Sequence, residues 1–371
     1  MTHHWLADRT ASFDVSGIRK FFELGARMSD PINLSIGQPD FDVPDEVKRA
    51  AIEAIEQGRN GYALSQGMPV LREKLQASID NRYGHDDREV FVTCGTSGGL
   101  TLAMLALVNP GDEVILPDPC FGMYDALVKM TGGQVVSVDT YPDFRLDPGR
   151  VAQAITPRTK LVLVNSPNNP TGTVAPRDDL EALAELADER DVVLLSDEIY
   201  HDFCYDEPFT SPAEFNPRVL VVDGFSKSHG MPGWRLGYAH GPRAIIQEMV
   251  KLQQYSFVCA PHPMQIAGAV AMDTDISGMI ANYRRKRDMI VQGLGDLYEL
   301  AHPGGAFYAF PKVPRGTATE FATTAIERHG LLVVPGSNFS GRDTHVRISY
   351  AASDDTLRRG IEALRHLADG Q

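Results

Sequence analysis

Polar residues follow three apolar segments that have the composition of buried β-strands. An amide-rich loop follows the first segment, an acidic residue follows the second and a lysine follows the third. In doubly wound sheets, ligands bind just beyond the carboxyl ends of the strands, so these side chains are expected to meet at one rim. The segments and the residues after them are KLVLVN (160–165) with Asn168 and Asn169, DVVLLS (191–196) with Asp197, and RVLVVD (218–223) with Lys227.

Each of these residues has an ordinary explanation when it is taken alone. The Asn-Asn-Pro run could be only a turn, Asp197 could cap the next helix, and most lysines are solvated. Their appearance in order, at successive strand ends, favours a shared site.

Arg235 comes eight residues after Lys227, in the run SKSHGMPGWRLG (226–237). A lysine amine can form a Schiff base and a guanidinium can grip a phosphate, so the pair could hold an anionic cofactor. The alternative is an exposed basic turn.

A glycine-rich run, TCGTSGGL (93–100), follows the predicted strand VFVT and enters a helical pattern. Backbone amides at Thr96, Ser97 and Gly98 could therefore cradle a phosphate at a helix N-terminus. The run lacks the GxGxxG spacing of dinucleotide sites and the GK[ST] ending of a P-loop, which disfavours NAD and ATP.

The elements that must position these residues alternate in type. Between about residues 90 and 240, short β-branched runs alternate with helical patterns, which predicts a mostly parallel sheet with helices on both faces. The other predicted strands are VFVT (90–93), DEVILP (112–117) and QVVSV (134–138).

Helices are predicted outside this block as well. Residues 44–57 keep helical spacing, with Val47, Ala51, Ala54 and Ile55 on one face and Gly58 at the end. In the C-terminal segment, Ser353 is the expected N-cap, Leu357, Ile361 and Leu364 form one face, and Gly370 follows.

The composition limits the class of protein. The chain has 371 residues, 43% of them hydrophobic, which suffices for a large core in two lobes. The net charge of −14 disfavours nucleic acid and anionic membranes as partners. Four widely spaced cysteines and the lack of an apolar leader indicate a cytoplasmic protein without a metal site. The expected parts are an N-terminal arm (1–35), a large domain (36–274) and a small domain (275–371).

Five motifs together resemble those of the class I/II aminotransferases, fold-type I enzymes that use pyridoxal 5′-phosphate (PLP). The resemblance runs from about residue 13 to the C-terminus. It implies an α/β fold with a large PLP-binding domain on a mostly parallel, seven-stranded-type sheet, a smaller α+β domain, and a homodimer with shared active sites. The motifs are SIGQPDF (35–41), NSPNNPTG (165–172), SDEIY (196–200), GFSKSHGMPGWRLG (224–237) and HVRISYA (345–351).

The resemblance implies a role for each matching residue. Lys227 would hold the cofactor as a Schiff base and Asp197 would pair with its pyridine nitrogen, so these two residues and Tyr200 are the predicted catalytic groups. Around the cofactor, Tyr200 and Asn169 would bind the phenolic oxygen, Phe121 would stack on the ring, and Thr96, Ser97, Gly98, Ser226 and Arg235 would surround the phosphate.

Substrate and partner contacts follow from the same resemblance. Arg347 would grip the substrate α-carboxylate with two parallel hydrogen bonds, helped by the Gly37 backbone and by Asn169. Tyr62 would reach the phosphate held by a partner subunit. The chain departs from many relatives at Gly224, where they carry a serine, and Ser226 is the expected substitute for that lost phosphate contact.

The implied reaction is transfer of an amino group from an L-amino acid to a 2-oxo acid such as 2-oxoglutarate or pyruvate. Lys227 would take the α-proton while Asp197 keeps the pyridine nitrogen protonated. The alternatives are a PLP β-lyase or synthase on the same fold, which typically reads DEIH where this chain reads DEIY, a non-catalytic PLP-binding regulator, and a nicotinamide dehydrogenase.

The donor is expected to be neutral or aromatic. No second arginine can be assigned to a distal carboxylate, and the candidate pocket residues are mostly apolar. They are Phe13, Ile18, Ile36 and Tyr124.

Overall fold

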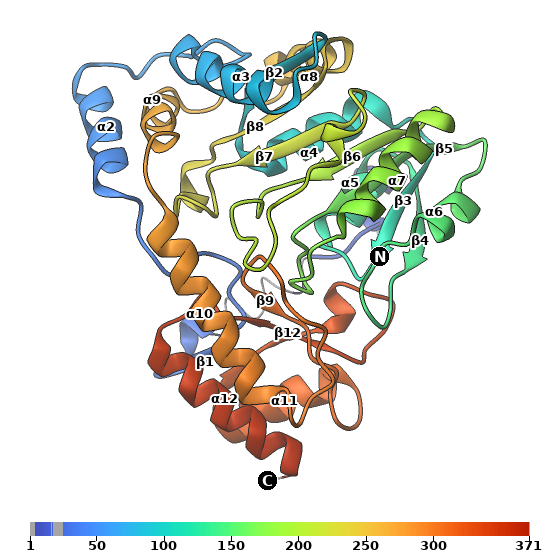
Figure 1. The fold of residues 1–371 in the computed structure, drawn as a ribbon, viewed down its shortest axis with the longest axis vertical. Coiled ribbons are helices and arrows are strands. Elements are labelled where there is room, and N and C mark those ends of the chain that lie inside the picture. Colours follow the sequence, from blue (N-terminus) through green and yellow to red (C-terminus); the bar gives the residue numbers. More distant parts are fainter. Residues whose placement is uncertain (1–3, 16, 18–24, 371) are drawn as a thin grey trace.

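The computed structural model describes residues 4–15, 17 and 25–370, which form two lobes (Figure 1). The larger lobe is built on a seven-stranded sheet with the order β2-β8-β7-β6-β5-β3-β4. Its strands are β2 (Arg88–Thr93), β3 (Glu113–Asp118), β4 (Gln134–Asp139), β5 (Thr159–Asn165), β6 (Val193–Asp197), β7 (Leu220–Gly224) and β8 (Gly237–Pro242).

The six predicted strands and the mostly parallel sheet are confirmed. The strand β8 was not predicted, and it runs antiparallel to both of its neighbours, β2 and β7. Its sequence GYAHGP lacks the β-branched signature of the other strands because it lies close to the turn into α4. A Cβ atom added at Gly237 would lie 2.6 Å from the Thr96 nitrogen, so only glycine allows this approach.

Helices cover both faces of the sheet. One face is covered by α4 (Gly95–Leu107), α5 (Met123–Met130) and α8 (Arg243–Tyr255), and the other by α6 (Pro148–Ala154) and α7 (Arg177–Glu189). Strands β5 and β6 are therefore buried on both sides, as their continuous apolar runs predicted. No described helix is long and apolar enough to cross a membrane.

Three further helices pack beside β2 and β8: α2 (Asp45–Glu56), α3 (Pro69–Tyr83) and α9 (His262–Ala271). The predicted helix over residues 44–57 is confirmed as α2, and Val47, Ala51 and Ala54 are buried as expected. Ile55 was expected on the same face, but its side chain is 48% exposed. The helix thus has a second apolar face that this chain alone does not cover.

The smaller lobe combines short strands with three helices. Strands β11 (Val334–Pro335), β12 (Val346–Ser349) and β9 (Tyr308–Ala309) form one sheet, and β1 (Ile32–Asn33) pairs in parallel with β10 (Leu331–Leu332). The helices are α10 (Ser277–Leu294), α11 (Ala318–His329) and α12 (Asp354–Asp369). The Ser353 hydroxyl caps α12 by accepting from the Thr356 nitrogen, as predicted. We propose lobe boundaries near residues 36 and 275 from this packing.

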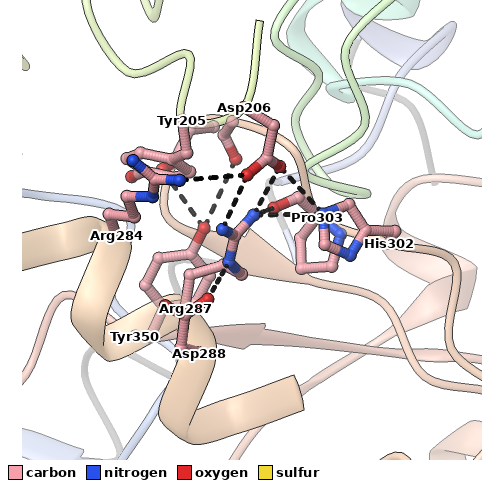
Figure 2. A network of polar contacts seen from close by, with 10 residues as sticks. Tyr205, Asp206, Arg284, Arg287, Asp288, His302, Pro303 and Tyr350 are labelled. Carbon is pink, nitrogen blue, oxygen red and sulfur yellow. Dashed lines mark hydrogen bonds and ion pairs between the residues drawn. The ribbon is translucent and has the colours of Figure 1, made fainter.

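A polar network joins the two lobes where α10 passes the loop after β6 (Figure 2). Arg287 on α10 donates two hydrogen bonds to the Asp206 carboxylate, at 2.8 and 3.0 Å. His302 also contacts Asp206, at 2.9 Å, and Arg287 forms a second ion pair with Asp288. The network ties the segment that follows Tyr200 to the smaller lobe.

Candidate active site

A cavity of about 310 Å³ lies at the carboxyl ends of β5, β6 and β7, beside the N-terminus of α4. Most of the residues predicted from sequence meet here. Its lining includes Gly37, Thr96, Ser97, Phe121, Asn169, Asp197, Tyr200, Ser226, Lys227, Arg235 and Arg347.

Two of the predicted residues do not line this cavity. Gly98 lies one turn into α4, where an added Cβ would approach the Cys94 side chain to 3.2 Å, so it packs against the protein. Tyr62 is 87% exposed on the surface of this chain. An assigned role for Tyr62 therefore depends on a second subunit.

Lys227 follows β7 and points into the cavity. Its Nζ donates a hydrogen bond of 2.8 Å to the carbonyl oxygen of Gly37. Burial and the neighbouring Arg347 lower the pKa of Lys227 to about 8, although Asp197 opposes this shift. A useful fraction of the amine is thus neutral near physiological pH, as a nucleophile or a general base requires.

Asp197 ends β6 and is buried. One carboxylate oxygen accepts a 2.7 Å hydrogen bond from the Tyr124 hydroxyl, and the other accepts from the Ile199 nitrogen at 3.2 Å. Burial raises the pKa of Asp197 to about 6, and Asp223 contributes to the rise. Tyr124 was predicted to line a side-chain pocket. It does line the cavity, and its hydroxyl is committed to Asp197.

An anion cradle lies at the N-terminus of α4. Arg235 donates a 2.6 Å hydrogen bond to the Ser97 hydroxyl. The Thr96 hydroxyl oxygen is buried and has no hydrogen-bond partner among the described residues. Arg235 holds φ at +56°, and a Cβ on Gly95 would lie 2.5 Å from its guanidinium. A cation, an unsatisfied hydroxyl and a helix N-terminus together suit a phosphate.

Gly224, the departure from the family pattern, has a steric cause in this chain. An added Cβ would lie 2.9 Å from the Cα of Gly237 on the adjacent strand β8 and 3.1 Å from the Thr96 hydroxyl. A serine there would require the two strands to move apart. Ser226 lines the cavity instead, where the sequence expected its substitute.

Arg347 is a buried cation without a carboxylate partner in the described part of the chain. It donates to the Asn169 side-chain oxygen at 3.0 Å and to the Ser35 carbonyl at 2.8 Å. The rings of Tyr308 and Phe339 lie over its guanidinium carbon, at 4.6 and 4.9 Å. Its Nε is buried without a partner. Such a group is suited to an incoming anion.

Two residues of the site were missed from the sequence. The side chain of Asn165 donates to the Asp197 carbonyl and accepts from the Asn169 nitrogen, both at 2.9 Å. Tyr308 shares a 2.9 Å hydrogen bond with the Tyr200 hydroxyl. Asn165 was read as the last residue of a strand, and the apolar run GAFYAF (305–310) concealed Tyr308 as ordinary core.

The predicted side-chain pocket is only partly present. Phe13 and Ile36 do not belong to the cavity lining, and Ile18 lies outside the described residues. The apolar walls are formed instead by Leu100, Phe121, Met123, Ile199 and Tyr308. Adjacent loops were more difficult to predict than strand ends because their path depends on tertiary packing.

The family is established by comparison with known proteins. The model of the family "Aminotransferase class I and II" matches residues 29–364, and the chain belongs to that family. An aspartate/prephenate aminotransferase of Thermus thermophilus is 40% identical over 356 residues, 92% of each chain. The aromatic-amino-acid aminotransferase 2 of Thermococcus litoralis is 33% identical over 377 residues, 97% of each.

Solved structures agree with this assignment. The aspartate aminotransferase of Thermus thermophilus with maleate superposes with a TM-score of 0.91 at 37% identity over 100% of both chains. That of Thermotoga maritima gives a TM-score of 0.94 at 32% identity, over 98% of this chain and 100% of the other. The protein is thus an aminotransferase with the expected α/β fold, and the dehydrogenase alternative is wrong.

Proposed function

We propose that this chain is a PLP-dependent aminotransferase that takes an amino group from a neutral or aromatic L-amino acid and passes it to a 2-oxo acid such as 2-oxoglutarate or pyruvate. The observation that carries the donor class is the set of cations in the cavity. Among its described lining residues these are Lys227, Arg235 and Arg347. Each has a ligand in the common reaction, so none is left for a second substrate carboxylate.

The side chains fit the cofactor that the family uses. PLP, when bound, supplies the electron sink that stabilises charge at the substrate α-carbon. Arg235 and Ser97 bind its phosphate, and the Thr96 hydroxyl gains the partner that it lacks. Tyr200 and Asn169 lie where they can bind the phenolic oxygen, and Phe121 covers the ring.

Asp197 and Lys227 move or hold the protons. A buried carboxylate with a pKa near 6 keeps its charge best beside a cation, so Asp197 holds a proton on the ring nitrogen. Lys227 Nζ accepts the proton from the substrate α-carbon and returns it to the neighbouring carbon. Its pKa of about 8 suits both directions at neutral pH.

Arg347 orients the substrate by its α-carboxylate. The two neutral partners of the guanidinium and its two flanking rings hold it in one plane, and no competing carboxylate occupies it in the described chain. Because every amino acid carries an α-carboxylate, this contact is common to all donors. The donor is then selected by the remaining walls.

The names of similar proteins span acidic and aromatic donors, so they do not choose between them. In this chain the walls at Leu100, Phe121, Met123 and Ile199 are apolar. An apolar wall leaves a distal carboxylate without a hydrogen-bond partner, which penalises aspartate more than an aromatic donor. The free thiols of all four cysteines fit the reducing cytoplasm in which we expect the reaction.

We also propose a homodimer with shared sites. A groove lined by Ile52, Ile55, Trp234 and Met264 adjoins Arg235, so it lies next to the phosphate cradle. Ile52 and Ile55 are about half exposed there, which is costly for apolar side chains in water. A second subunit would cover this groove and bring its Tyr62 to the phosphate. Sedimentation should give a dimer, and Tyr62→Phe should weaken PLP retention without changing the order of donors.

The proposed function is tested by a donor panel assayed with 2-oxoglutarate and with pyruvate as acceptors. We expect aromatic or neutral donors to have the highest kcat/KM, and activity to require an acceptor. Aspartate as the best donor would overturn the donor class. Release of ammonia and pyruvate from cysteine-type donors without any acceptor would instead favour a β-lyase on the same fold.

A further inference from the structure

We propose that Tyr308 is a positioning residue with two separable functions: its hydroxyl supports the hydrogen bond that Tyr200 gives to the cofactor, and its ring holds Arg347 in place for the substrate carboxylate. This inference rests on the proposed function and deepens it, because it links the group that binds the cofactor to the group that binds the substrate.

The position of Tyr308 is fixed by the sheet of the smaller lobe. Tyr308 begins β9 and lies opposite Ser349 on β12, and its side chain is 1% exposed. Arg347 lies two residues before Ser349 on the same strand, and so points to the same face. Diagonal neighbours across an antiparallel pair are within reach of aromatic and long side chains. The tyrosine ring and the guanidinium are therefore set against each other by strand register.

The ring contact orients the guanidinium. The carbon of the Arg347 guanidinium lies 4.6 Å from the centre of the Tyr308 ring, and Phe339 flanks it at 4.9 Å. A cation over an aromatic face is stabilised most where water is excluded, as it is here. Loss of the Tyr308 ring would leave Arg347 with one flanking ring and would let its plane tilt.

The hydroxyl contact has a direction once the cofactor is considered. The two phenol oxygens are 2.9 Å apart, and each carries one proton. If Tyr200 gives its proton to the phenolic oxygen of the cofactor, Tyr308 must be the donor to Tyr200. A hydrogen bond received by Tyr200 draws electron density from its oxygen and makes its own proton a stronger donor, which is the cooperative effect of hydrogen-bond chains.

The surroundings of Tyr200 leave Tyr308 as its hydrogen-bond partner. The other titratable or charged groups that influence Tyr200 are Arg347, Asp197 and Lys227, and burial raises the pKa of Tyr200 well above its usual value. The Tyr308 hydroxyl also fills the space beside Gly37, where an added Cβ would lie 2.8 Å from it. Gly37 in turn accepts the hydrogen bond of Lys227. Tyr308 thus contacts both sides of the site.

Two substitutions separate the functions. Tyr308→Phe keeps the ring and the core volume but removes the hydroxyl, whereas Tyr308→Leu removes both. Tyr350→Phe is the matched control, since Tyr350 is equally buried, donates only to the carbonyls of Gly305 and Ala306, and does not line the cavity.

The first measurement is the pH titration of the visible absorbance of the resting holoenzyme, which needs no turnover. Tyr308→Phe should move the midpoint upward by roughly half a pH unit, because a weaker bond from Tyr200 leaves the lysine–cofactor linkage more basic. KM for amino acid donors should stay within about twofold, since the ring contact is intact. Tyr350→Phe should leave the midpoint unchanged.

The second measurement is KM across the donor panel. Tyr308→Leu should raise KM about tenfold for every donor alike, because it disturbs the shared carboxylate contact. An unmoved midpoint in Tyr308→Phe, or a KM change confined to some donors in Tyr308→Leu, would overturn the inference. If the parent protein itself shows no visible absorbance with PLP, the proposed function fails instead, and the two failures are thereby distinguished.

Discussion

Two buried arginines on the smaller lobe do opposite things. Arg287 and Arg347 are 3% and 1% exposed. Arg287 meets the carboxylates of Asp206 and Asp288, which raise its pKa (Figure 2). Arg347 meets a side-chain amide, a carbonyl and two rings, and burial lowers its pKa.

The difference separates a structural cation from a functional one. Burial of a charge is costly unless an opposite charge accompanies it. Arg287 is compensated within the fold and so holds the lobes together. Arg347 is left without its counterion in the described chain, so part of the folding free energy maintains a site for an anion supplied from outside. The same contrast holds for the carboxylates Asp206 and Asp197.

The largest expected effect concerns Asp197. Asp197→Asn keeps the shape but loses the charge that holds a proton on the ring nitrogen, so transamination should fall by about a thousandfold or more, roughly 4 kcal/mol of barrier. Cofactor should still bind through Lys227 and Arg235. Single-turnover absorbance and α-proton exchange measure the slowed step.

The neighbouring Glu198 provides the matched control for this change. It is also buried, with a pKa raised by burial to about 7, but it accepts from Ser211 and does not line the cavity. Glu198→Gln should keep near-normal turnover. If both variants lost activity equally, Asp197 would be no more than a structural carboxylate.

The two aspartates should give opposite pH dependences of stability in the cofactor-free protein. Asp197 has a folded pKa of about 6, above an unfolded value of about 3.9. The folded protein therefore retains a proton between these values, and its unfolding free energy falls as pH rises from about 4 to about 6. Asp197→Asn should be more stable than the parent at neutral pH, by on the order of 3 kcal/mol, with no difference near pH 4.

Asp206 has the reverse sign because Arg287 depresses its pKa. Its stabilisation is present above about pH 4 and is lost as pH falls below that value. Asp206→Asn should thus be less stable than the parent at neutral pH, and the difference should shrink in acid. Urea unfolding at several pH values measures both slopes, and slopes of the same sign would contradict the contrast.

Arg347 should control the affinity for every donor. Arg347→Lys replaces a planar fork with a point charge, so KM should rise about thirtyfold, about 2 kcal/mol, in similar proportion for all amino acids. Unfolding free energy should stay within about 1 kcal/mol of the parent, because no buried carboxylate is left unpaired. A switch of preference among donors would instead make Arg347 a side-chain reader.

Arg287 should show the converse result, with a smaller effect. Arg287→Met removes charged hydrogen bonds to Asp206, which is partly exposed and keeps His302 and Arg284 nearby. We expect a loss of about 1.5 kcal/mol in unfolding free energy and a KM within about twofold of the parent for the folded enzyme. A tenfold rise in KM at unchanged stability would place Arg287 in the substrate site.

The sequence predicted the parts of the site that lie at strand ends. Asn169, Asp197 and Lys227 could be found because buried strands have recognisable apolar runs and a parallel sheet brings their ends together. Tyr308 could not, because its function comes from strand register across the smaller lobe, where β9 has only two residues.

The remaining differences have similar causes. The strand β8 was missed because Gly237 and Gly241 reflect close backbone approach and not strand propensity. Ile55 was assigned to the core because helical periodicity does not distinguish a face covered by the same chain from one that another chain would cover. Phe13 and Ile36 were placed from loop positions, for which a single sequence gives no path.

The central claim is that Lys227 carries the cofactor in a cavity completed by Asp197 and Arg235. Borohydride reduction of the PLP-loaded protein, followed by digestion and peptide mapping, tests it directly. We predict a reduced cofactor on the peptide that contains Lys227, and loss of this adduct in Lys227→Ala. Finding the adduct on another lysine, or no adduct after reconstitution with PLP, would contradict the account.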